Sequence, residues 1–133
     1  SMRGNILVVD DNPVNVELLL HLLESHGHTV HCALNANAAL ECLQRQRPDL
    51  LLLDMQMPGM DGYTLARLLK GDAATADIPI VAVTSYAMSC DRQKALDAGC
   101  DDHVTKPIDT RRLPNVVAQY LAGNRGTASA SNA

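Results

Sequence analysis

Leu50-Leu51-Leu52-Leu53-Asp54 carries four apolar residues straight into a carboxylate. Pro48 precedes this run and Pro58-Gly59 follows it, so turn-forming residues bound it on both sides. A short apolar run bounded in this way is typical of a strand that is buried on both faces of a parallel sheet. Asp54 then lies at the carboxyl end of that strand. In open parallel α/β sheets, this edge is where ligands and chemistry collect.

Apolar segments and helical patterns alternate along the rest of the chain. Asn12 can cap a helix that begins at Pro13, and Gly27 and Gly99 are typical helix terminators. Such alternation requires right-handed crossovers and a parallel sheet covered by helices on both faces, so we expect a doubly wound α/β fold. The expected strands cover residues 6–9, 28–33, 50–54, 78–83 and 102–105, and the expected helices 13–27, 36–45, 63–70, 91–98 and 113–121.

The composition fits one domain without a broad basic surface. The chain has 133 residues, 47% of them hydrophobic, and a net charge of −4. This balance argues against nonspecific binding to nucleic acid or to an anionic membrane. No apolar stretch reaches the roughly 18 residues of a spanning helix, and no signal sequence is apparent, so a cytoplasmic protein with reduced cysteines is expected. Residues 1–122 are predicted to form the domain, and the Gly/Ala/Ser/Asn-rich segment 123–133 a flexible tail, linker or cloning remnant.

Polar residues follow four of the predicted strands at the point where each strand ends. They are Asp10-Asp11, Asp54, Thr84 and Lys106. The carboxyl ends of parallel strands meet at one edge of the sheet, so three carboxylates would lie close together and need a compensating cation. A set of oxygen ligands without His or Cys favours Mg²⁺, and Lys106 supplies a second positive charge that suits a phosphate. The sequence therefore predicts a magnesium site beside a lysine.

A carboxylate between Mg²⁺, an ammonium and a hydroxyl can act as a nucleophile in phosphoryl transfer. Asp54 would attack phosphorus and form an aspartyl phosphate. The Thr84 hydroxyl can donate to that phosphoryl group only if its loop moves inward, which links occupancy of Asp54 to the position of the backbone. The site is thus predicted to be a switch as well as a reaction centre.

Five segments taken in order resemble the receiver domain of two-component response regulators and of hybrid sensor histidine kinases. The resemblance covers about residues 5 to 121. The segments are Val8-Val9-Asp10-Asp11-Asn12, Leu53-Asp54-Met55-Gln56-Met57-Pro58-Gly59-Met60-Asp61-Gly62, Val83-Thr84-Ser85, Ala98-Gly99-Cys100-Asp101-Asp102 and Lys106-Pro107-Ile108.

The resemblance implies a flavodoxin-like sheet of five parallel strands in the order 2-1-3-4-5, with five helices. It implies a signalling module, not an enzyme, that takes a phosphoryl group from the phosphohistidine of a sensor kinase or of a histidine phosphotransfer protein. Such a module assists its own phosphorylation and dephosphorylation. The surface formed by the fourth helix, fifth strand and fifth helix would carry the output and allow a weak or phosphorylation-dependent dimer. The sequence is compatible with a stand-alone regulator and with a fragment of a larger protein.

The resemblance also assigns individual residues. Asp10, Asp11, Asp54 and the backbone carbonyl of Gln56 would hold Mg²⁺. Thr84 and Lys106 would bind the phosphoryl oxygens, with a cis peptide bond between Lys106 and Pro107.

The switch position departs from the family pattern. Three residues before the lysine the family usually has Tyr or Phe, whereas this chain has His103, whose ring can carry a charge near neutral pH. Gln56 and Tyr86 occupy positions where the family varies in how fast water reaches the acyl phosphate. A bulky Tyr86 is expected to slow hydrolysis.

Three other interpretations are less well supported. A phosphatase of the haloacid dehalogenase type needs two Asp residues one apart on the first strand, whereas Asp10 and Asp11 are adjacent. A flavin-binding flavodoxin needs a Ser/Thr/Gly-rich phosphate loop where this chain has Asp11-Asn12-Pro13. A zinc site at His26, His28 and His31 lacks a fourth ligand. Asp61 and Asp72 are expected to be ordinary helix-start or solvated residues.

Overall fold

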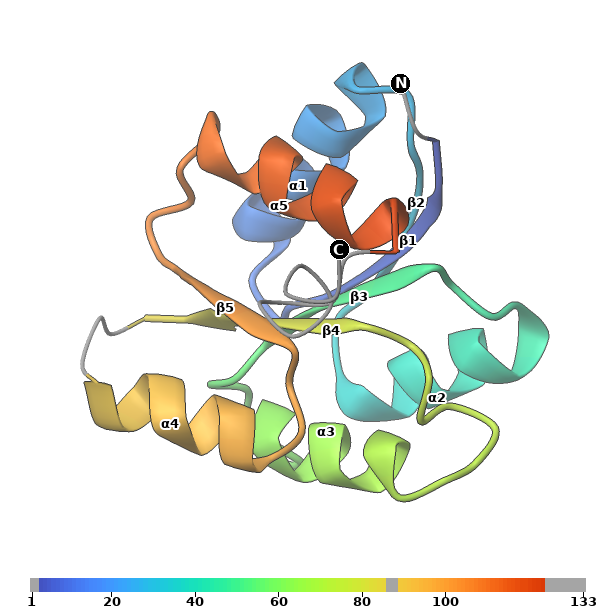
Figure 1. The fold of residues 1–133 in the computed structure, drawn as a ribbon, viewed down its shortest axis with the longest axis vertical. Coiled ribbons are helices and arrows are strands. Elements are labelled where there is room, and N and C mark those ends of the chain that lie inside the picture. Colours follow the sequence, from blue (N-terminus) through green and yellow to red (C-terminus); the bar gives the residue numbers. More distant parts are fainter. Residues whose placement is uncertain (1–2, 86–88, 124–133) are drawn as a thin grey trace.

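The sheet has the predicted architecture. The computed structural model describes residues 3–85 and 89–123, and within these ranges five parallel strands alternate with five helices (Figure 1). The strand order is β2-β1-β3-β4-β5, which confirms the predicted doubly wound fold. The elements are β1 (Asn5–Val9), α1 (Pro13–Ser25), β2 (Thr29–Ala33), α2 (Ala36–Arg45), β3 (Leu50–Asp54), α3 (Gly62–Lys70), β4 (Ile80–Thr84), α4 (Ser89–Asp97), β5 (Asp102–Thr105) and α5 (Arg112–Leu121).

Strand β3 lies in the middle of the sheet between two hydrophobic layers. Helices α1 and α5 cover one face, and α2, α3 and α4 cover the other (Figure 1). Leu50 and Leu52 pack into the core under α1 and α5, whereas Leu51 and Leu53 pack into the core on the opposite face. All four leucines are fully buried, and each such side chain contributes about 1.5–3 kcal/mol of burial free energy. The core therefore holds the backbone that carries Asp54 from both sides.

Local chemistry sets both ends of α1. Asn12 is the N-cap, and its side chain accepts a hydrogen bond from the N–H of Val14, with Pro13 in the first turn. At the other end Gly27 has φ +91°, its N–H donates to the carbonyl of Glu24, and the N–H of His28 donates to the carbonyl of Leu23. These two bonds form a Schellman motif, which favours glycine at the residue with positive φ. The predicted cap and terminator are confirmed.

Three predicted strand starts were wrong by one or two residues. Strand β1 begins at Asn5, one residue before the expected Ile6. The strand expected from His28 begins at Thr29, because the Schellman motif uses the N–H of His28 to close α1. The strand expected from Ile78 begins at Ile80, because Pro79 has no N–H to donate and only its carbonyl pairs, accepting from Leu51 at 3.0 Å. The helix predicted over 91–98 covers Ser89–Asp97, and the α2 range was correct.

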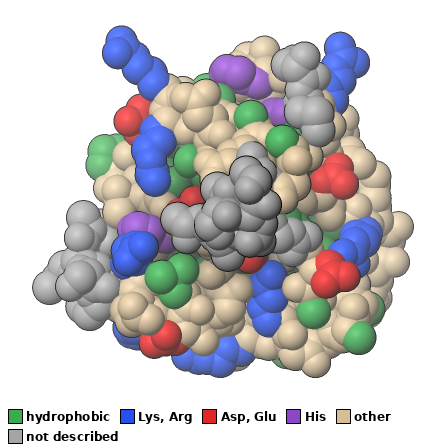
Figure 2. All heavy atoms as spheres, viewed as in Figure 1, with side chains coloured by type: hydrophobic (Ala, Val, Ile, Leu, Met, Phe, Trp, Pro, Cys, Tyr) green, Lys and Arg blue, Asp and Glu red, His purple; other side chains and the backbone are tan. Residues whose placement is uncertain are grey.

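Charged side chains of both signs are interspersed over the face of the molecule that Figure 2 shows. No helix among the described residues has the length and apolar character needed to span a membrane.

Candidate phosphoacceptor site

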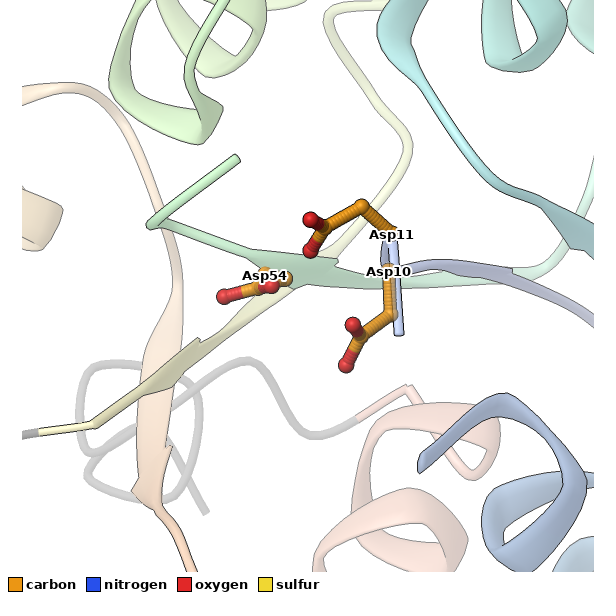
Figure 3. A group of neighbouring side chains, drawn as sticks. All are labelled: Asp10, Asp11 and Asp54. Atoms are coloured by element: carbon orange, nitrogen blue, oxygen red, sulfur yellow. The ribbon is translucent and has the colours of Figure 1, made fainter. Parts of the chain in front are cut away.

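Three carboxylates meet beyond the carboxyl ends of β1 and β3. These strands pair in parallel with Val9 opposite Leu53, so Asp10 and Asp54 leave the sheet side by side. Asp10, Asp11 and Asp54 each offer a carboxylate oxygen, and these atoms lie within 4.8 Å of one another. Figure 3 shows the three side chains at the neighbouring ends of β1 and β3, with Asp11 above and Asp10 below the strand end in this view. Asp10 and Asp54 are only 2% and 1% exposed, whereas Asp11 is exposed.

A glycine lets the loop after β3 fold back onto this edge. A Cβ atom on Gly62 would collide with the backbone of Asp54 and Met55, and the Gly62 N–H donates to the carbonyl of Met55 at 3.2 Å. Asp61 caps α3 by accepting a hydrogen bond from the N–H of Thr64. The prediction of Asp61 as a helix-start residue is confirmed, and the close approach at Gly62 places the loop against the backbone of Asp54 and Met55.

Lys106 brings a positive charge to the two buried carboxylates. Its Nζ lies 3.5 Å from Oδ2 of Asp10 and 3.4 Å from Oδ2 of Asp54. The N–H of Lys106 donates to the carbonyl of Thr84 at 2.7 Å, which extends the pairing of β5 with β4 and directs the lysine to the same sheet edge. The Lys106–Pro107 bond is cis, as predicted.

The electrostatics of Asp54 follow from its burial. Removal from water raises the pKa of Asp54 to about 6, and the nearby charge of Asp10 also raises it. The Gln56 N–H, which donates to Oδ1 of Asp54 at 3.1 Å, and the ammonium of Lys106 oppose this shift. Near pH 7 Asp54 is therefore mostly ionised, although the protein pays a free-energy cost for that charge.

The donor set fits a hard divalent cation. Oδ2 of Asp10 is buried and accepts no hydrogen bond from any described residue, although the Lys106 ammonium lies near it. Oδ1 of Asp10, in contrast, accepts from the N–H of Asn12 at 2.9 Å. One oxygen of Asp10 is thus fixed while the other faces the cluster. A group of carboxylates with one buried oxygen lacking a donor is the arrangement that Mg²⁺ can neutralise.

The other predicted residues lie on β4, on β5 and in the loop after β3. Thr84 is fully buried at the end of β4, one residue beyond Val83, which pairs with Asp54. The Ser85 N–H donates to Oε1 of Gln56 at 3.2 Å, a contact between the β3–α3 and β4–α4 loops that the sequence did not indicate. His103 pairs with Ala82 in the interior of the β4–β5 ladder, so it does not join the carboxylates. Tyr86 lies outside the described residues.

His26, His28 and His31, which were considered as a zinc site, do not form a metal-binding group among the described residues. Within residues 3–85 and 89–123, Asp10, Asp11 and Asp54 are the one group of three or more potential metal-binding side chains close enough to share an ion. Asp72 is exposed, in agreement with its prediction as a solvated residue.

A buried carboxylate, an acidic pair and a lysine at the edge of a 2-1-3-4-5 sheet are the features of the receiver class of signalling domain. The family model described as the response regulator receiver domain matches residues 6–118. This chain therefore belongs to the receiver domain family of two-component systems.

Relatives of two sizes share this domain. The chain is 33% identical over 120 residues to the polar-differentiation response regulator DivK of Brucella anthropi, with 90% of this chain and 98% of DivK covered. It is 40% identical over 123 residues to the sensor protein GacS of Pseudomonas syringae pv. syringae, with 90% of this chain but only 14% of GacS covered. The same domain thus accounts for nearly all of one relative and a small part of the other.

A solved structure of a similar domain contains a metal ion. The receiver domain of the sensor histidine kinase PA1611 from Pseudomonas aeruginosa PAO1 was crystallised with magnesium coordinated in its active site cleft. It superposes with a TM-score of 0.82 at 31% identity, covering 91% of this chain and 99% of that one.

Proposed function

We propose that Asp54 accepts a phosphoryl group from the phosphohistidine of a sensor histidine kinase or of a histidine phosphotransfer protein, in a Mg²⁺-dependent reaction. The observation that carries the proposal is the placement of the Asp54 carboxylate: it is buried at the end of β3, yet it lies within 3.4 Å of the Lys106 ammonium and beside two further carboxylates. A carboxylate with only a structural role would not need this concentration of charge.

Each residue of the site has a separate role in the proposed transfer. An oxygen of ionised Asp54 attacks phosphorus, the bond from phosphorus to the histidine nitrogen breaks, and its electron pair returns to the imidazole ring. The Lys106 ammonium, which balances Asp54 before the reaction, can then bind an oxygen of the transferred group. Thr84 supplies a hydroxyl from the end of the neighbouring strand. When bound, Mg²⁺ would neutralise charge on the transferring group, held by Asp10, Asp11, Asp54 and the Gln56 carbonyl.

Acetyl phosphate provides a direct test of the acceptor. The wild-type protein incubated with Mg²⁺ and acetyl phosphate should gain the mass of one phosphoryl group, and Asp54→Asn should not. Asp72→Asn, which changes an exposed carboxylate away from the site, should behave as wild type. Absence of an adduct on wild type, or an equal adduct on Asp54→Asn, would refute the proposal.

Asp11 is the exposed member of the proposed Mg²⁺ ligand set, so its contribution can be tested without disturbing the core. Asp11 is exposed, so Asp11→Asn removes a ligand while leaving the buried pair intact. We expect Mg²⁺ to raise the melting temperature of wild type at pH 7 in a saturable manner, and Asp11→Asn to weaken Mg²⁺ affinity about tenfold or more. Thermal melts across a Mg²⁺ titration measure both effects, with Asp72→Asn as the control. Equal Mg²⁺ affinity in Asp11→Asn would remove this residue from the site.

An apolar strip on α1 offers a place for the phosphodonor to dock. Val14 and Leu18 are 74% and 43% exposed and lie one helical turn apart, just after the acidic pair. A protein that carries the phosphohistidine must approach Asp54, so it contacts the start of α1. Leu18→Ser is expected to slow transfer from a phosphorylated histidine phosphotransfer protein about tenfold while leaving labelling by acetyl phosphate unchanged. Equal loss with both donors would point to damage at the acceptor site instead.

The proposed readout couples Asp54 to the surface formed by α4, β5 and α5 through Thr84 and His103. His103 is half-buried, and burial lowers its pKa; Arg92 and Arg112 act in the same direction, and Asp102 opposes them. The ring is therefore neutral at pH 7 and can turn inward without burying a charge.

We expect the His103 ring to titrate below its ordinary value of 6.5. An NMR titration of the ring protons, assigned with His103→Gln, measures this pKa. A pKa at or above 6.5 would contradict the burial argument.

The proposal includes self-phosphorylation from small phosphodonors, autodephosphorylation modulated by Gln56 and Tyr86, and a domain that ends near residue 122. It also includes a cytoplasmic location and a weak or phosphorylation-dependent dimer through α4, β5 and α5.

A further inference from the structure

A second polar groove lies between the end of α1 and the start of α5, apart from the carboxylate cluster. It has a volume of about 370 Å³, within the range of small-molecule sites. Its polar lining residues are His26, His28, Thr110, Arg111 and Asn115, and no lining residue is acidic. In Figure 2, histidine side chains gather at the upper edge of the molecule, over the end of α1. In a chain with a net charge of −4, this is a local concentration of cationic and donor groups.

His28 is buried with one ring nitrogen left unpaired. Its side chain is only 7% exposed, and Nδ1 is buried without a hydrogen-bond partner among the described residues. Nε2 is not among these buried unpaired atoms and His28 lines the groove, so we assign Nε2 as the nitrogen that faces the groove. A buried lone pair costs less free energy than a buried N–H group, so the proton belongs on Nε2.

The Nε2–H group of His28 is a donor that needs no charge. Burial and the neighbouring His26 lower the pKa of His28, which keeps its ring neutral near pH 7. The Schellman motif at Gly27 holds the residue in place, since the His28 N–H is bonded to the Leu23 carbonyl. The turn between α1 and β2 therefore presents a fixed donor to the groove.

Arg111 provides the permanent charge. Its backbone N–H donates to Oδ1 of Asp109 at the start of α5, but its guanidinium forms no salt bridge with any described residue. His26 also lines the groove, and its Nδ1 lies 3.0 Å from the carbonyl of Leu22, which can only accept. A guanidinium beside fixed N–H donors matches the oxygens of a phosphate or a carboxylate.

We propose that this groove binds an oxyanion, a phosphate or carboxylate group, between the guanidinium of Arg111 and Nε2–H of His28. A metal ion is disfavoured there, because the groove offers two imidazoles without a carboxylate or thiolate, and Arg111 would repel a cation. This site is independent of phosphorylation at Asp54.

NMR of the ¹⁵N-labelled protein in EDTA, without Mg²⁺, tests the site with two probes: inorganic phosphate and succinate at constant ionic strength. At least one probe should shift the amide signals of Thr110, Arg111 and Asn115 saturably, with a dissociation constant of about 1–10 mM. Binding of phosphate alone would assign the site to phosphate groups, binding of succinate alone to carboxylates, and binding of both to oxyanions in general.

Variants distinguish specific binding in the groove from nonspecific attraction of anions to the positive charges. Arg111→Gln and His28→Leu should each weaken binding about tenfold, whereas Arg112→Gln, which removes the neighbouring arginine that does not line the groove, should leave it unchanged. If His28→Leu fails to fold, Arg111→Gln alone decides, because Arg111 is exposed. The absence of saturable shifts with both probes, or equal loss in Arg111→Gln and Arg112→Gln, would overturn the proposal.

Discussion

Replacing Asp54 by asparagine is expected to stabilise the metal-free protein by about 2 kcal/mol at pH 7. The folded protein raises the pKa of this carboxyl from 3.8 to about 6, mainly through burial, so the folded state holds the charged form at a cost. Asparagine has nearly the same shape without the charge, and its side-chain oxygen can still accept the hydrogen bond from the N–H of Gln56. The substitution therefore removes the cost of a buried charge and keeps the local contact.

The gain in stability from Asp54→Asn should depend on pH, because the pKa of Asp54 differs between the folded and unfolded states. Between pH 3.8 and about 6 the folded state binds more protons at Asp54 than the unfolded state does, so the contribution of Asp54 to stability falls as the pH rises through this window. Below pH 3.8 both states are protonated at this residue, and the advantage of Asp54→Asn should vanish. Above about pH 6 the advantage should be fully developed.

Urea unfolding in EDTA at pH 7 and at pH 4 measures this difference. Asp72→Asn, at an exposed carboxylate, should change the free energy of unfolding by less than about 0.5 kcal/mol at either pH. An Asp54→Asn protein that is less stable than wild type at pH 7, or whose gain is the same at both pH values, would contradict the assignment of the cost to the buried charge.

The fold was predictable because its signals are local and agree with one another. The apolar run at Leu50–Asp54, the cap at Asn12 and the alternation of strand and helix patterns each specify the same layered sheet. The strand order follows from the family resemblance, and the structure confirms it. Two strand starts were misplaced where a backbone donor was unavailable, at His28 and Pro79, since pattern alone does not show where an N–H is already used or missing.

The acidic cluster was predictable for a topological reason, whereas the surroundings of the cluster were not. All parallel strands deliver their carboxyl ends to one edge, so residues far apart in sequence, such as Asp10 and Asp54, had to meet. The contact of Gln56 with the N–H of Ser85 depends on the conformations of two loops, which no periodic pattern encodes. The groove at His28 was missed for a related reason: its residues come from a helix end and from the start of another helix, and their meeting depends on how α1 and α5 pack.

Replacing Lys106 by glutamine should have the opposite effect on stability to Asp54→Asn. The ammonium lies 3.5 Å and 3.4 Å from oxygens of two carboxylates that are almost fully buried. No other cation of the described part of the chain pairs with Asp10 or Asp54, so removal of the ammonium leaves both buried charges unbalanced in the metal-free protein, which is costly. Because the lysine side chain is about one-fifth exposed, water compensates in part, so we expect a loss of about 2 kcal/mol at pH 7.

The double variant Asp54→Asn, Lys106→Gln isolates the interaction between the two side chains. Once Asp54 is neutral, the lysine balances only Asp10, so its removal should cost at least about 1 kcal/mol less than it does in the wild-type background. Urea unfolding of the four proteins in EDTA completes the thermodynamic cycle. Lys94→Gln is the control, since Lys94 is exposed and its Nζ instead lies 4.9 Å from the centre of the Tyr63 ring. Additive effects would mean that Lys106 does not stabilise the Asp54 charge.

The same variant should also separate charge balance from phosphoryl transfer. With Mg²⁺ and acetyl phosphate, Lys106→Gln should retain the acceptor carboxylate but form the adduct at least about tenfold more slowly, because no ammonium remains to bind the oxygen of the incoming group. Time-resolved intact mass measures this rate, and Lys94→Gln should match wild type. A wild-type rate in Lys106→Gln would confine the lysine to holding the buried carboxylates, whereas a slow rate together with the coupling in the cycle assigns one ammonium to both tasks. In that case the Lys106 ammonium stabilises the Asp54 carboxylate before the transfer, and it becomes available to the phosphoryl group once the carboxylate has been phosphorylated.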